Sequence, residues 1–316
     1  MKNFLNVHDV KDVEQLAKDA IALKQHPFKH KQLGENKTMV LLFLNSSLRT
    51  RISTQKAAQS LGMNTIVLNL GQDSWQMDYE DGAIMNGTTA EHIKEGAAVI
   101  SEYADIIGIR AFPTLTDKER DYTEYVLHKF LENVKVPVVN MESATVHPLQ
   151  SLTDLMTIRE HTTKAKPKVV LSWAPHIKPL PQCVANSFAE WMNKSDVEFV
   201  ITHPEGYELN EQFSGNAKII YNQDEAFENA DFIYAKNWSA YNDYGKIMGE
   251  HSDWLITDKK MQLTNNAKFM HCLPTRRNIE VADDVLDSDY SLVIKQAANR
   301  EFAAQIVLKS ILENQQ

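Results

Sequence analysis

The stretch TMVLLFLNSSLRTRIST, residues 38–54, decides the fold that we expect of this chain. Its opening run TMVLLFL is too short to span a membrane and has the length and apolar character of a buried strand. The residues from Thr50 onward have a helical pattern that ends at Gly62, a favourable C-terminal cap. A strand followed directly by a helix is the repeating unit of a parallel α/β sheet. Arg49 and Arg51 stand where the strand gives way to the helix.

Strands and helices alternate along the whole chain. The predicted strands are 38–44, 64–70, 105–111, 136–141, 166–173, 197–203, 231–236 and 267–273. The predicted helices are 7–24, 50–61, 89–104, 122–133, 148–161, 180–193, 226–230 and 298–314. This alternation predicts an α/β protein with two domains, each a parallel sheet flanked by helices.

The domain boundary is expected in the helix 148–161, where the strand–helix pattern of the first half ends and a second series begins. We expect a first domain of residues 1–146 and a second domain of residues 147–297. The last helix has apolar positions at helical spacing, and we expect residues 298–316 to return to the first domain.

Composition excludes several classes of protein. The 316 residues carry a formal net charge of -9, which disfavours a nucleic-acid partner because phosphate-backbone affinity depends on clustered Lys and Arg. The N-terminus is charged and no run approaches the roughly 20 apolar residues of a membrane span, so we expect a cytoplasmic protein without a membrane partner. Cys183 and Cys272 form neither a disulfide framework nor a CxxC metal motif, and no metal or cofactor is expected.

Ligands of open parallel sheets bind beyond the carboxyl ends of the strands, and Ser47 to Arg51 lie there. Ser47 is placed to cap the following helix, whose N–H groups and dipole favour an anion. The guanidiniums of Arg49 and Arg51 would add bidentate donors that match a phosphate. The stretch therefore predicts a phosphate site without the glycines of a P-loop, although alone it fits a solvated arginine pair equally well.

Three further polar residues stand at similar places. Arg110 ends the predicted strand 105–111, although a lone arginine there is more often a surface residue. His147 precedes a proline at a helix N-terminus, where the dipole would lower its pKa and keep the imidazole neutral. Gln150 follows one turn later and could donate a hydrogen bond beside it. A histidine that only caps the helix is an equally good reading of His147 taken alone.

The strand 267–273 ends in His271-Cys272-Leu273-Pro274, and three motifs of this chain together resemble the aspartate/ornithine carbamoyltransferase family. The family marks are S-x-R-T-R, H-P-x-Q-x-L-x-D and H-C-L-P. They stand here at residues 47–51, 147–154 and 271–274, in family order and across most of the chain. This resemblance outweighs the alternatives that each motif leaves open by itself.

The resemblance implies transfer of the carbamoyl group of carbamoyl phosphate to an amine. The residues it implies for carbamoyl phosphate are Ser47, Leu48, Arg49, Thr50, Trp75, Arg110, His147, Gln150 and Leu273. Of these, Arg49, Thr50, Arg110, His147 and Gln150 would be catalytic, together with Cys272. Donors such as Thr50, Arg110 and His147 would stabilise the oxyanion that develops on the carbonyl.

The amine is implied by a narrower resemblance. The chain lacks the D-x-x-x-S-M-G loop that holds free ornithine, and its segments at 71–81, 231–245 and 271–278 are similar to the branch that acts on N-acylated ornithine in arginine biosynthesis. The residues implied for the acylated amino acid are Glu142, His176, Lys178, Lys236, Cys272, Arg276 and Ala90. In this branch Trp75 lies on a loop that reaches a neighbouring subunit, so a homotrimer with shared active sites is implied.

Ala90 bears on the acyl group. Acetylornithine enzymes have a glutamate at the position of Ala90 and a lysine at that of Glu280, whereas succinyl-specific enzymes have a proline and an acidic residue. A glutamate would repel a succinyl carboxylate and alanine leaves room for it, so we expect N-succinylornithine as the substrate and N-acetylornithine as the alternative.

Two other functions are open to a doubly wound fold. A nicotinamide-dependent dehydrogenase needs G-x-G-x-x-G after a strand, and neither half of the chain supplies these glycines. An inactive anion-binding relative would be favoured by loss of Arg110, His147 or Gln150, and all three residues are present.

Overall fold

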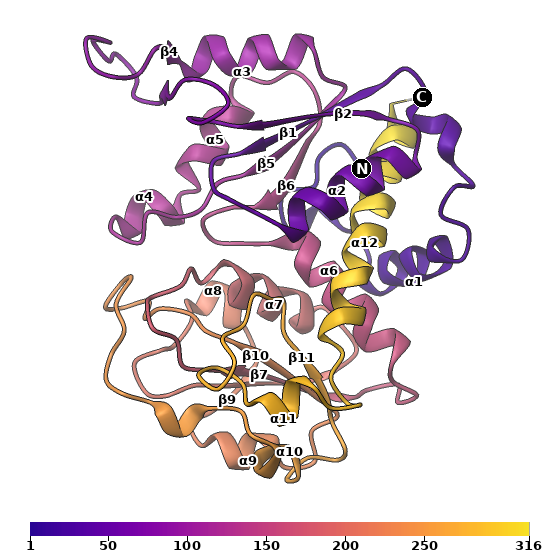
Figure 1. Cartoon of the computed structure of the whole chain (residues 1–316), viewed down its shortest axis with the longest axis vertical. Coiled ribbons are helices and arrows are strands. Elements are labelled where there is room, and N and C mark those ends of the chain that lie inside the picture. The colour runs from indigo at the N-terminus through magenta and orange to yellow at the C-terminus, as the bar shows by residue number, and fades with distance from the viewer. Residues whose placement is uncertain (316) are drawn as a thin grey trace. The chain divides into compact units, whose positions relative to one another are not determined.

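The computed structural model describes residues 1–315 and divides the chain into two compact units. Unit 1 comprises residues 1–11, 19–149 and the chain from Arg300 onward, and unit 2 comprises residues 12–18 and 150–299. One division falls between residues 11 and 12, and the other three fall within the helices α1 (Val13–Lys24), α6 (Pro148–Glu160) and α12 (Val293–Asn314). The last helix thus ends in unit 1, as expected from the sequence (Figure 1).

Unit 1 is built on a four-stranded parallel sheet. Its elements after α1 are η2 (Lys31–Gly34), β1 (Thr38–Phe43), α2 (Arg49–Ser60), β2 (Asn64–Asn69), β3 (Met77–Asp78), β4 (Glu91–His92), α3 (Ile93–Glu102), β5 (Ile106–Arg110), α4 (Lys118–Tyr122), α5 (Tyr125–Leu131) and β6 (Val138–Glu142), and η1 (Val7–Asp9) precedes them. The strand order β2-β1-β5-β6 reverses direction between β1 and β5. Ligands of doubly wound sheets bind beyond the carboxyl ends of the strands at such a reversal.

The sheet of unit 1 has helices on both faces (Figure 1). Its side toward α3 and α5 is a continuous apolar core, formed by Val40, Leu42, Ile93, Ala97, Ile107, Ile109, Leu127, Phe130 and Val138. The helix α2 lies on the other face beside the C-terminal part of α12 (Figure 1). Lys56 of α2 binds Glu301 of α12 at 2.8 Å, and Ser60 lies 3.4 Å from the same carboxylate.

Unit 2 contains a second parallel sheet, of five strands. Its elements after α6 are β7 (Lys168–Trp173), α7 (Cys183–Asn193), β8 (Glu198–Thr202), α8 (Glu211–Ser214), β9 (Lys218–Ile220), α9 (Gln223–Phe227), β10 (Phe232–Lys236), η3 (Ser252–Trp254), α10 (Asp258–Met261), β11 (Lys268–Met270) and α11 (Asp283–Leu286). The order β11-β10-β7-β8-β9 reverses between β7 and β10. Residues that follow β7 and β10 therefore lie at the reversal of this sheet, where ligands of doubly wound sheets bind, as do the residues after β1 and β5 in unit 1.

Most predicted elements are found, and the differences have local causes. Gly62 ends α2 with φ of 89°, as predicted. The predicted helix 89–104 begins only at Ile93, because residues 91–92 pair with β3. The helix predicted at 122–133 is interrupted at Glu124, whose φ of 52° is left-handed. The last strand ends at Met270, and the next N–H, of His271, bonds the Gln296 side chain instead of a neighbouring strand.

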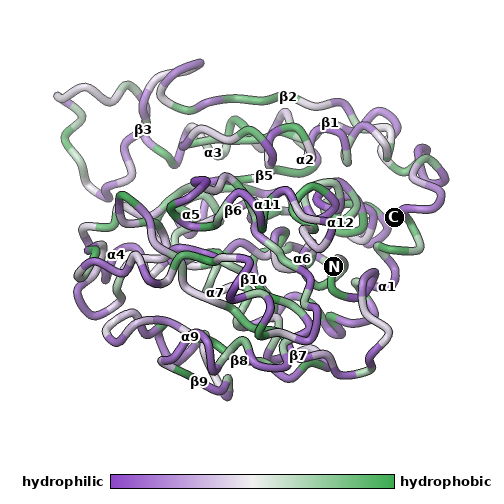
Figure 2. Tube along the Cα trace, turned by 60° about the horizontal axis from the view of Figure 1, so that its bottom comes forward, coloured by the Kyte–Doolittle hydropathy of each residue, from purple (hydrophilic) through white to green (hydrophobic). Residues whose placement is uncertain are grey.

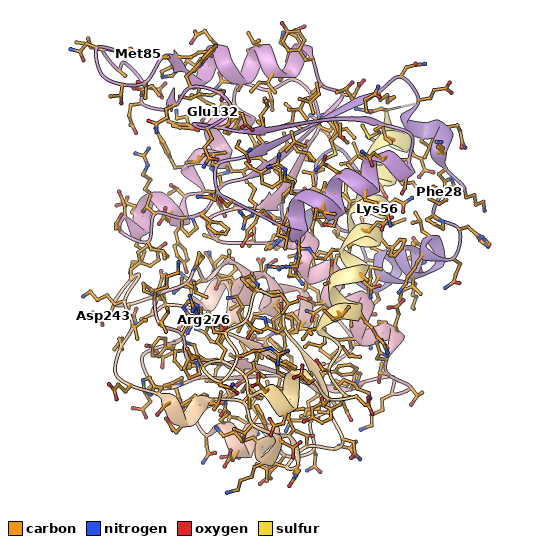
Figure 3. All side chains as sticks on the ribbon, in the orientation of Figure 1. Phe28, Lys56, Met85, Glu132, Asp243 and Arg276 are labelled. Carbon is orange, nitrogen blue, oxygen red and sulfur yellow. The ribbon has the colours of Figure 1, made fainter. Side chains whose placement is uncertain are left out.

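Apolar residues are not confined to the interior of unit 1. Figure 2 shows hydrophobic colour along the edge strand β2, whose Ile66 is 44% exposed. The loop between β2 and α3 also carries exposed apolar side chains, among them Trp75 and Ile84. Figure 3 shows Met85 at the outer tip of this loop. Edge strands and loops with such exposed groups are typical of surfaces that meet other molecules.

Candidate active site

The N-terminus of α2 follows β1 at the reversal of the unit 1 sheet. The helix begins at Arg49, and its N-cap is Leu48 rather than Ser47, with no side-chain hydrogen bond to the first turn. The expectation that Ser47 caps this helix is therefore wrong, because Leu48 already has a helical backbone. A helix N-terminus without a side-chain cap leaves its dipole available to an external anion.

Arg51 has a structural partner. Its guanidinium donates a hydrogen bond to Asn69 Oδ1 at 3.1 Å and lies 6.0 Å from the centre of the Phe43 ring. These contacts tie the first turn of α2 to the ends of β1 and β2. Arg49 lies near enough to His147 to lower its pKa, so the two arginines of the motif have different surroundings.

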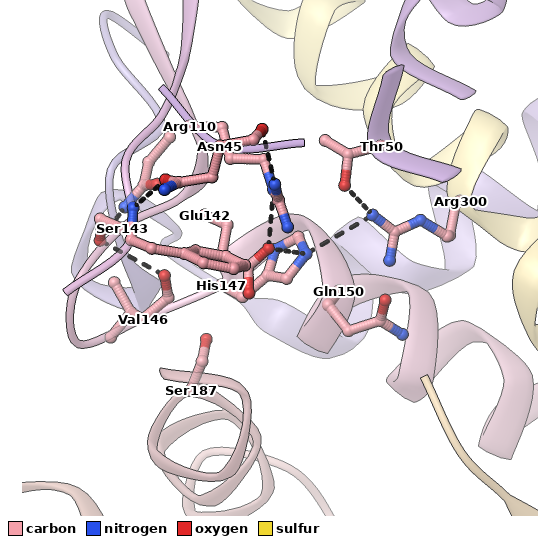
Figure 4. Close-up of polar contacts among 12 residues, drawn as sticks. Asn45, Thr50, Arg110, Glu142, Ser143, Val146, His147, Gln150, Ser187 and Arg300 are labelled. Atoms are coloured by element: carbon pink, nitrogen blue, oxygen red, sulfur yellow. Dashed lines mark hydrogen bonds and ion pairs between the residues drawn. The ribbon is translucent and has the colours of Figure 1, made fainter. Parts of the chain in front are cut away.

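Arg110 ends β5 and joins three segments of unit 1. Its Nε donates to Glu142 Oε2 at 3.0 Å, and its Nη1 donates to the carbonyl oxygens of Asn45 and Ser46 at 3.0 and 2.6 Å (Figure 4). The guanidinium carbon also lies 4.1 Å from the centre of the Phe112 ring. Arg110 and Glu142 are both buried, so this ion pair holds the carboxyl ends of β5 and β6 and the turn after β1 in one arrangement.

His147 is buried beside this ion pair. It immediately precedes α6, which begins at Pro148 as predicted, and its Nε2 lies 3.6 Å from Glu142 Oε2. Burial lowers the pKa of His147 to about 3, and the positive charges of Arg300, Arg110 and Arg49 act in the same direction. The imidazole is therefore neutral, as expected from the sequence, with burial as the largest cause and the arginine charges as further causes.

Arg300 is a member of this group that sequence reasoning missed. It lies in α12 and is 7% exposed, and its Nη2 donates to Thr50 Oγ1 at 2.6 Å and lies 3.5 Å from His147 Nε2 (Figure 4). The sequence feature that could have indicated Arg300 is its position in the helix that was expected to return to the first domain. We call Thr50, Arg110, Glu142, His147 and Arg300 the His147 cluster.

Glu142 belongs to the His147 cluster through its carboxylate. It was expected among the residues for the acylated amino acid, but here it binds Arg110 and faces His147. Because it attracts the proton of an imidazolium, Glu142 opposes the fall in the pKa of His147. Within unit 1, Glu142 thus balances the charge of the basic side chains around it.

In unit 2 the second and third sequence motifs are joined by hydrogen bonds. Gln150 donates to Asp154 Oδ1 at 2.7 Å, and Gln296 of α12 donates to the same oxygen at 2.7 Å. Gln296 also accepts a hydrogen bond from the His271 N–H at 2.9 Å. All four side chains are buried. Gln296, which no motif marked, therefore links the orientation of Gln150 to the start of the H-C-L-P segment.

The H-C-L-P segment leaves the sheet after β11. Cys272 is buried and is not in a disulfide, and Leu273 precedes a cis peptide bond to Pro274. The Leu273 N–H donates to His271 Nδ1 at 2.9 Å, which fixes the tautomer of that ring with its proton on Nε2. Tyr234 of β10 adjoins Cys272, and burial raises the pKa of Tyr234 above its ordinary value.

Three cationic or basic side chains gather at the reversal of the unit 2 sheet. Lys236 ends β10, His176 follows β7, and Arg276 Nε donates to His176 Nε2 at 3.2 Å. Lys236 is 8% exposed as a residue, and within residues 1–315 its ammonium has no hydrogen-bond or ion-pair partner and is not itself a fully buried atom. Burial lowers the pKa of His176, and Lys236 and Arg276 lower it further. We call His176, Lys236 and Arg276 the Lys236 cluster.

Lys178 supports His176 through its backbone. The Lys178 carbonyl lies 2.8 Å from His176 Nδ1, and the Lys178 side chain is exposed. The carboxylate of Glu280 is buried and accepts a hydrogen bond from the Arg276 N–H at 2.6 Å. The backbone at both ends of the Lys236 cluster is therefore held in place.

Trp75 and Ala90 lie on the long loop between β2 and α3. Trp75 is 57% exposed, and its Nε1 donates to Glu91 Oε2 at 2.6 Å. Ala90 is exposed, and its N–H bonds the Gln76 carbonyl at 3.2 Å. The loop thus brings Trp75 next to Glu91, the neighbour of Ala90, within unit 1.

Two classes of site are not found in the described chain. Among residues 1–315 no group of three or more His, Cys, Asp or Glu side chains is arranged to hold a metal ion. None of the helices described is both long enough and apolar enough to cross a bilayer.

Two domain models of one protein family match successive parts of the chain. Residues 2–160 match the aspartate/ornithine carbamoyltransferase carbamoyl-P binding domain, and residues 182–311 match the Asp/Orn binding domain of that family. The chain is 53% identical to N-succinylornithine carbamoyltransferase of Bacteroides fragilis, over 99% of both proteins. It is 34% identical to N-acetylornithine carbamoyltransferase of Xanthomonas campestris pv. campestris, over 99% of this chain and 98% of the relative.

Solved structures give the same result for the fold. Acetylornithine transcarbamylase complexed with acetylcitrulline matches 98% of this chain and 99% of its own with a TM-score of 0.90 and 34% identity. A glutamate-to-alanine mutant of N-acetyl-L-ornithine transcarbamylase, complexed with carbamyl phosphate and N-succinyl-L-norvaline, has the same TM-score and identity and matches 98% and 100%. With both of its halves matched by the family models, this chain belongs to the aspartate/ornithine carbamoyltransferase family.

Proposed function

We propose that this protein transfers the carbamoyl group of carbamoyl phosphate to the side-chain amine of N-succinyl-L-ornithine, giving N-succinyl-L-citrulline and phosphate. Family membership supports the reaction, and 53% identity to an N-succinylornithine carbamoyltransferase supports the substrate. The structural observation that carries the proposal is the His147 cluster, where a neutral imidazole is surrounded by hydrogen-bond donors at a sheet reversal.

Carbamoyl phosphate is proposed to bind unit 1. Ser47, Leu48, Arg49 and Thr50 would hold its phosphate at the uncapped N-terminus of α2, where backbone N–H groups and the helix dipole favour an anion. The family resemblance also implies roles in carbamoyl phosphate binding for Trp75, Gln150 and Leu273. We accordingly assign residues 1–146 with 298–316 to carbamoyl phosphate binding and residues 147–297 to the acylated amino acid.

Arg110, Thr50 and His147 would act on the carbamoyl oxygen. When an amine attacks the carbonyl carbon, negative charge develops on that oxygen, and donors fixed in advance stabilise it without reorganisation. A neutral imidazole suits this role because it donates a hydrogen bond without adding a second positive charge beside the arginines. Arg300, which binds Thr50 and lies by His147, would help to orient both side chains.

The amine must lose a proton for the reaction to proceed. A free alkyl amine with a pKa of about 10 is mostly protonated at neutral pH, so binding has to favour the small neutral fraction. The arginines would stabilise the departing phosphate, whose oxygens can take the proton that the attacking nitrogen releases. Cys272 is proposed to lie beside the amine, in keeping with the role that the resemblance implies for it.

The Lys236 cluster is proposed to hold the carboxylates of the acylated ornithine. The ammonium of Lys236 has no hydrogen-bond or ion-pair partner among residues 1–315, so an incoming carboxylate would be its ion-pair partner. Arg276 offers a planar donor set for a second carboxylate, with His176 and Lys178 beside it. Glu142 remains in the proposed substrate set, although its carboxylate already binds Arg110.

Ala90 supports the succinyl group over the acetyl group. An alanine leaves space and removes a negative charge at a position where acetylornithine enzymes, by resemblance, have a glutamate. A glutamate-to-alanine mutant of N-acetyl-L-ornithine transcarbamylase was obtained with N-succinyl-L-norvaline bound, which agrees with this argument. We further propose a cytoplasmic homotrimer that acts in arginine biosynthesis, with Trp75 serving the site of a neighbouring subunit.

The test is formation of the ureido product from carbamoyl phosphate with N-succinylornithine, N-acetylornithine and free ornithine in parallel. Turnover of the succinyl compound with little of the others is expected. Preference for the acetyl compound would leave the reaction intact and overturn the assignment of Ala90. As a control on the site, Arg49→Ala should lose nearly all turnover while its circular dichroism stays that of a folded protein.

A further inference from the structure

The turn of residues 143–146 sets the geometry of the His147 cluster. It leads from Glu142, the last residue of β6, to His147, the residue before α6. The turn is closed by a hydrogen bond from the Ser143 N–H to the Val146 carbonyl at 2.9 Å. Because Glu142 and His147 flank this turn, its shape determines whether their side chains meet, which they do at 3.6 Å.

A single carboxylate holds the turn from outside. Glu124 Oε1 accepts hydrogen bonds from Ser143 Oγ and Thr145 N, both at 2.8 Å, and from Thr145 Oγ1 at 2.5 Å. Its Oε2 accepts a hydrogen bond from Ala144 N at 3.1 Å. One side chain thus binds three consecutive residues of the turn, and two of its four donors are backbone N–H groups that cannot rotate away.

The backbone of Glu124 is also specialised. Its φ of 52° and ψ of 37° place it in the left-handed region, between α4 and α5, where a glutamate is uncommon. Residues held in such conformations persist when the surrounding contacts fix them, and here the contacts are those of the carboxylate. Burial raises the pKa of Glu124, while the hydrogen bonds from Thr145, Ser143 and Ala144 oppose that rise.

We infer that Glu124 is a positioning residue for catalysis, whose carboxylate fixes the turn 143–146 and so holds His147 and Glu142 in place around Arg110. The inference rests on the function proposed above for the His147 cluster. Glu124 acts through the turn, and its effect is on the geometry of the groups that meet the substrate. A displacement of about 1 Å of such groups can reduce turnover by about 100-fold.

A carboxylate is required here because every group that faces it is a donor. In Glu124→Gln one oxygen is replaced by an NH2 group, which would face the N–H of Ala144 or Thr145 and leave it unsatisfied. The hydroxyls of Ser143 and Thr145 can rotate to accept a hydrogen bond, but the two N–H groups cannot. The substitution preserves volume, so it changes the turn with little change in packing.

Asp121 supplies a matched control in the same unit. Its carboxylate accepts hydrogen bonds from Thr114 N and Leu115 N, each at 2.9 Å, and from Thr114 Oγ1 at 3.0 Å. It is a buried acidic side chain that fixes a turn, just as Glu124 does, but its turn carries no residue of the proposed site. Asp121→Asn therefore reports the cost of losing such a carboxylate where catalysis is not involved.

The experiment compares wild type, Glu124→Gln and Asp121→Asn as full-length proteins. Wild type is first assayed with carbamoyl phosphate and N-succinylornithine, N-acetylornithine or ornithine, and failure with all three counts against the proposed function. The position of His147 is measured without reference to activity, from the 15N resonances of histidine-labelled protein at neutral pH. The His147 signals are assigned by their absence from His147→Asn.

Glu124→Gln is expected to shift or broaden the His147 signals and to lower kcat by roughly 10- to 100-fold. Asp121→Asn is expected to leave both the signals and kcat near wild type. If Glu124→Gln fails to fold, Glu124→Asp keeps the charge, suits the left-handed backbone and should show the same changes at smaller size. Unchanged His147 signals, or equal losses of kcat in the two carboxylate variants, would overturn the inference.

Discussion

The His147 cluster and the Lys236 cluster both lie at sheet reversals, yet their charges are balanced in different ways. In the His147 cluster Arg110 binds Glu142 at 3.0 Å, and both residues are buried. In the Lys236 cluster the lysine residue is 8% exposed, and its ammonium has no hydrogen-bond or ion-pair partner among residues 1–315. The charges of the first cluster are therefore paired within unit 1, whereas the second offers a cation that a ligand can neutralise.

This difference separates stability from binding. Removing Arg110 from the His147 cluster should leave the buried Glu142 carboxylate without its partner and should destabilise the fold. Removing the Lys236 ammonium from the Lys236 cluster leaves no internal group unpaired, so it should affect only the binding of the ligand. The predictions below test that separation, beginning with the largest expected effect.

Arg110→Gln is expected to have the largest effect on both stability and activity. The substitution leaves the buried Glu142 carboxylate unpaired, and breaking a buried ion pair in this way costs about 3–5 kcal/mol of unfolding free energy. Turnover should be lost as well, because Arg110 is a proposed donor to the carbamoyl oxygen. Urea unfolding and the ureido assay measure the two effects.

The double variant Arg110→Gln, Glu142→Gln serves as its control. It removes both charges, so most of the lost stability should return while turnover stays low. If Arg110→Gln alone were as stable as wild type, the ion pair of Arg110 and Glu142 would not be the contact that organises the His147 cluster.

Lys236→Met should separate binding from stability. We expect kcat/KM for the acylated ornithine to fall by roughly 10- to 100-fold, which corresponds to about 1.5–3 kcal/mol for one hydrogen bond to a charged group. The free energy of unfolding should be little changed, because the Lys236 ammonium has no hydrogen-bond or ion-pair partner among residues 1–315 that the substitution would leave unpaired. Kinetics with varied acylornithine and urea unfolding of the same preparation provide the comparison.

The control for Lys236→Met is the KM of carbamoyl phosphate, which should stay near the wild-type value because Lys236 is not proposed to bind that substrate. A loss of stability as large as that of Arg110→Gln would contradict the contrast drawn between the two clusters. It would mean that Lys236 has a role in the fold that its surroundings do not reveal.

The neutral state of His147 predicts how stability depends on pH. Its pKa is lowered to about 3, so between the ordinary histidine pKa of about 6.5 and pH 3 the unfolded chain binds a proton that the folded chain does not. Unfolding free energy should therefore fall with decreasing pH in this range, by up to about 1.4 kcal/mol per pH unit from this residue. Above pH 6.5 His147 should contribute no slope.

Urea unfolding of wild type and His147→Asn between pH 4 and 8 measures this contribution. The variant should show a shallower decline below about pH 6.5, and the two curves should run parallel above it. Parallel curves over the whole range would mean that His147 takes up a proton equally in the folded and unfolded chains, so that its pKa is not lowered in the folded protein.

Sequence reasoning found the sheets and most of the residues discussed, for reasons that are local. Runs such as 38–44 and 105–111 are apolar and end in polar residues, and a parallel sheet brings their carboxyl ends to one edge. His147 next to a proline marked the start of α6 correctly. These are properties of short segments, and short segments are what a sequence displays directly.

The residues that were missed act across long distances in the chain. Arg300 meets Thr50 over 250 positions, and Gln296 meets Asp154 over 142. Glu124 interrupts a helical pattern and binds a turn some 20 positions away. Their partners are decided by the packing of α12 and α5, which no local pattern encodes. The start of α2 shows the same limit over a short distance. Ser47 was expected to cap this helix, but Leu48 already has a helical backbone and is the N-cap.

Adjacent arginines in unit 2 give the smallest predicted effect and the finest test of the comparison. Arg277 is exposed and binds Asp283 and Asp287 at 2.7–2.8 Å, and these bonds hold the pKa of both carboxylates below their ordinary values. Arg276 instead donates to His176 and belongs to the Lys236 cluster. Exposed ion pairs contribute little to stability, so Arg277→Gln should behave like wild type.

Arg276→Gln, by contrast, should raise the KM of the acylated ornithine, because it removes a proposed carboxylate donor without breaking an internal ion pair. Kinetics of the two variants side by side distinguish a charge that binds substrate from one that serves only the surface. If Arg277→Gln raised KM as much as Arg276→Gln, general positive charge near the site would explain binding. The two carboxylates of the substrate would then have no specific partners, and the Lys236 cluster would attract anions only through its overall positive charge.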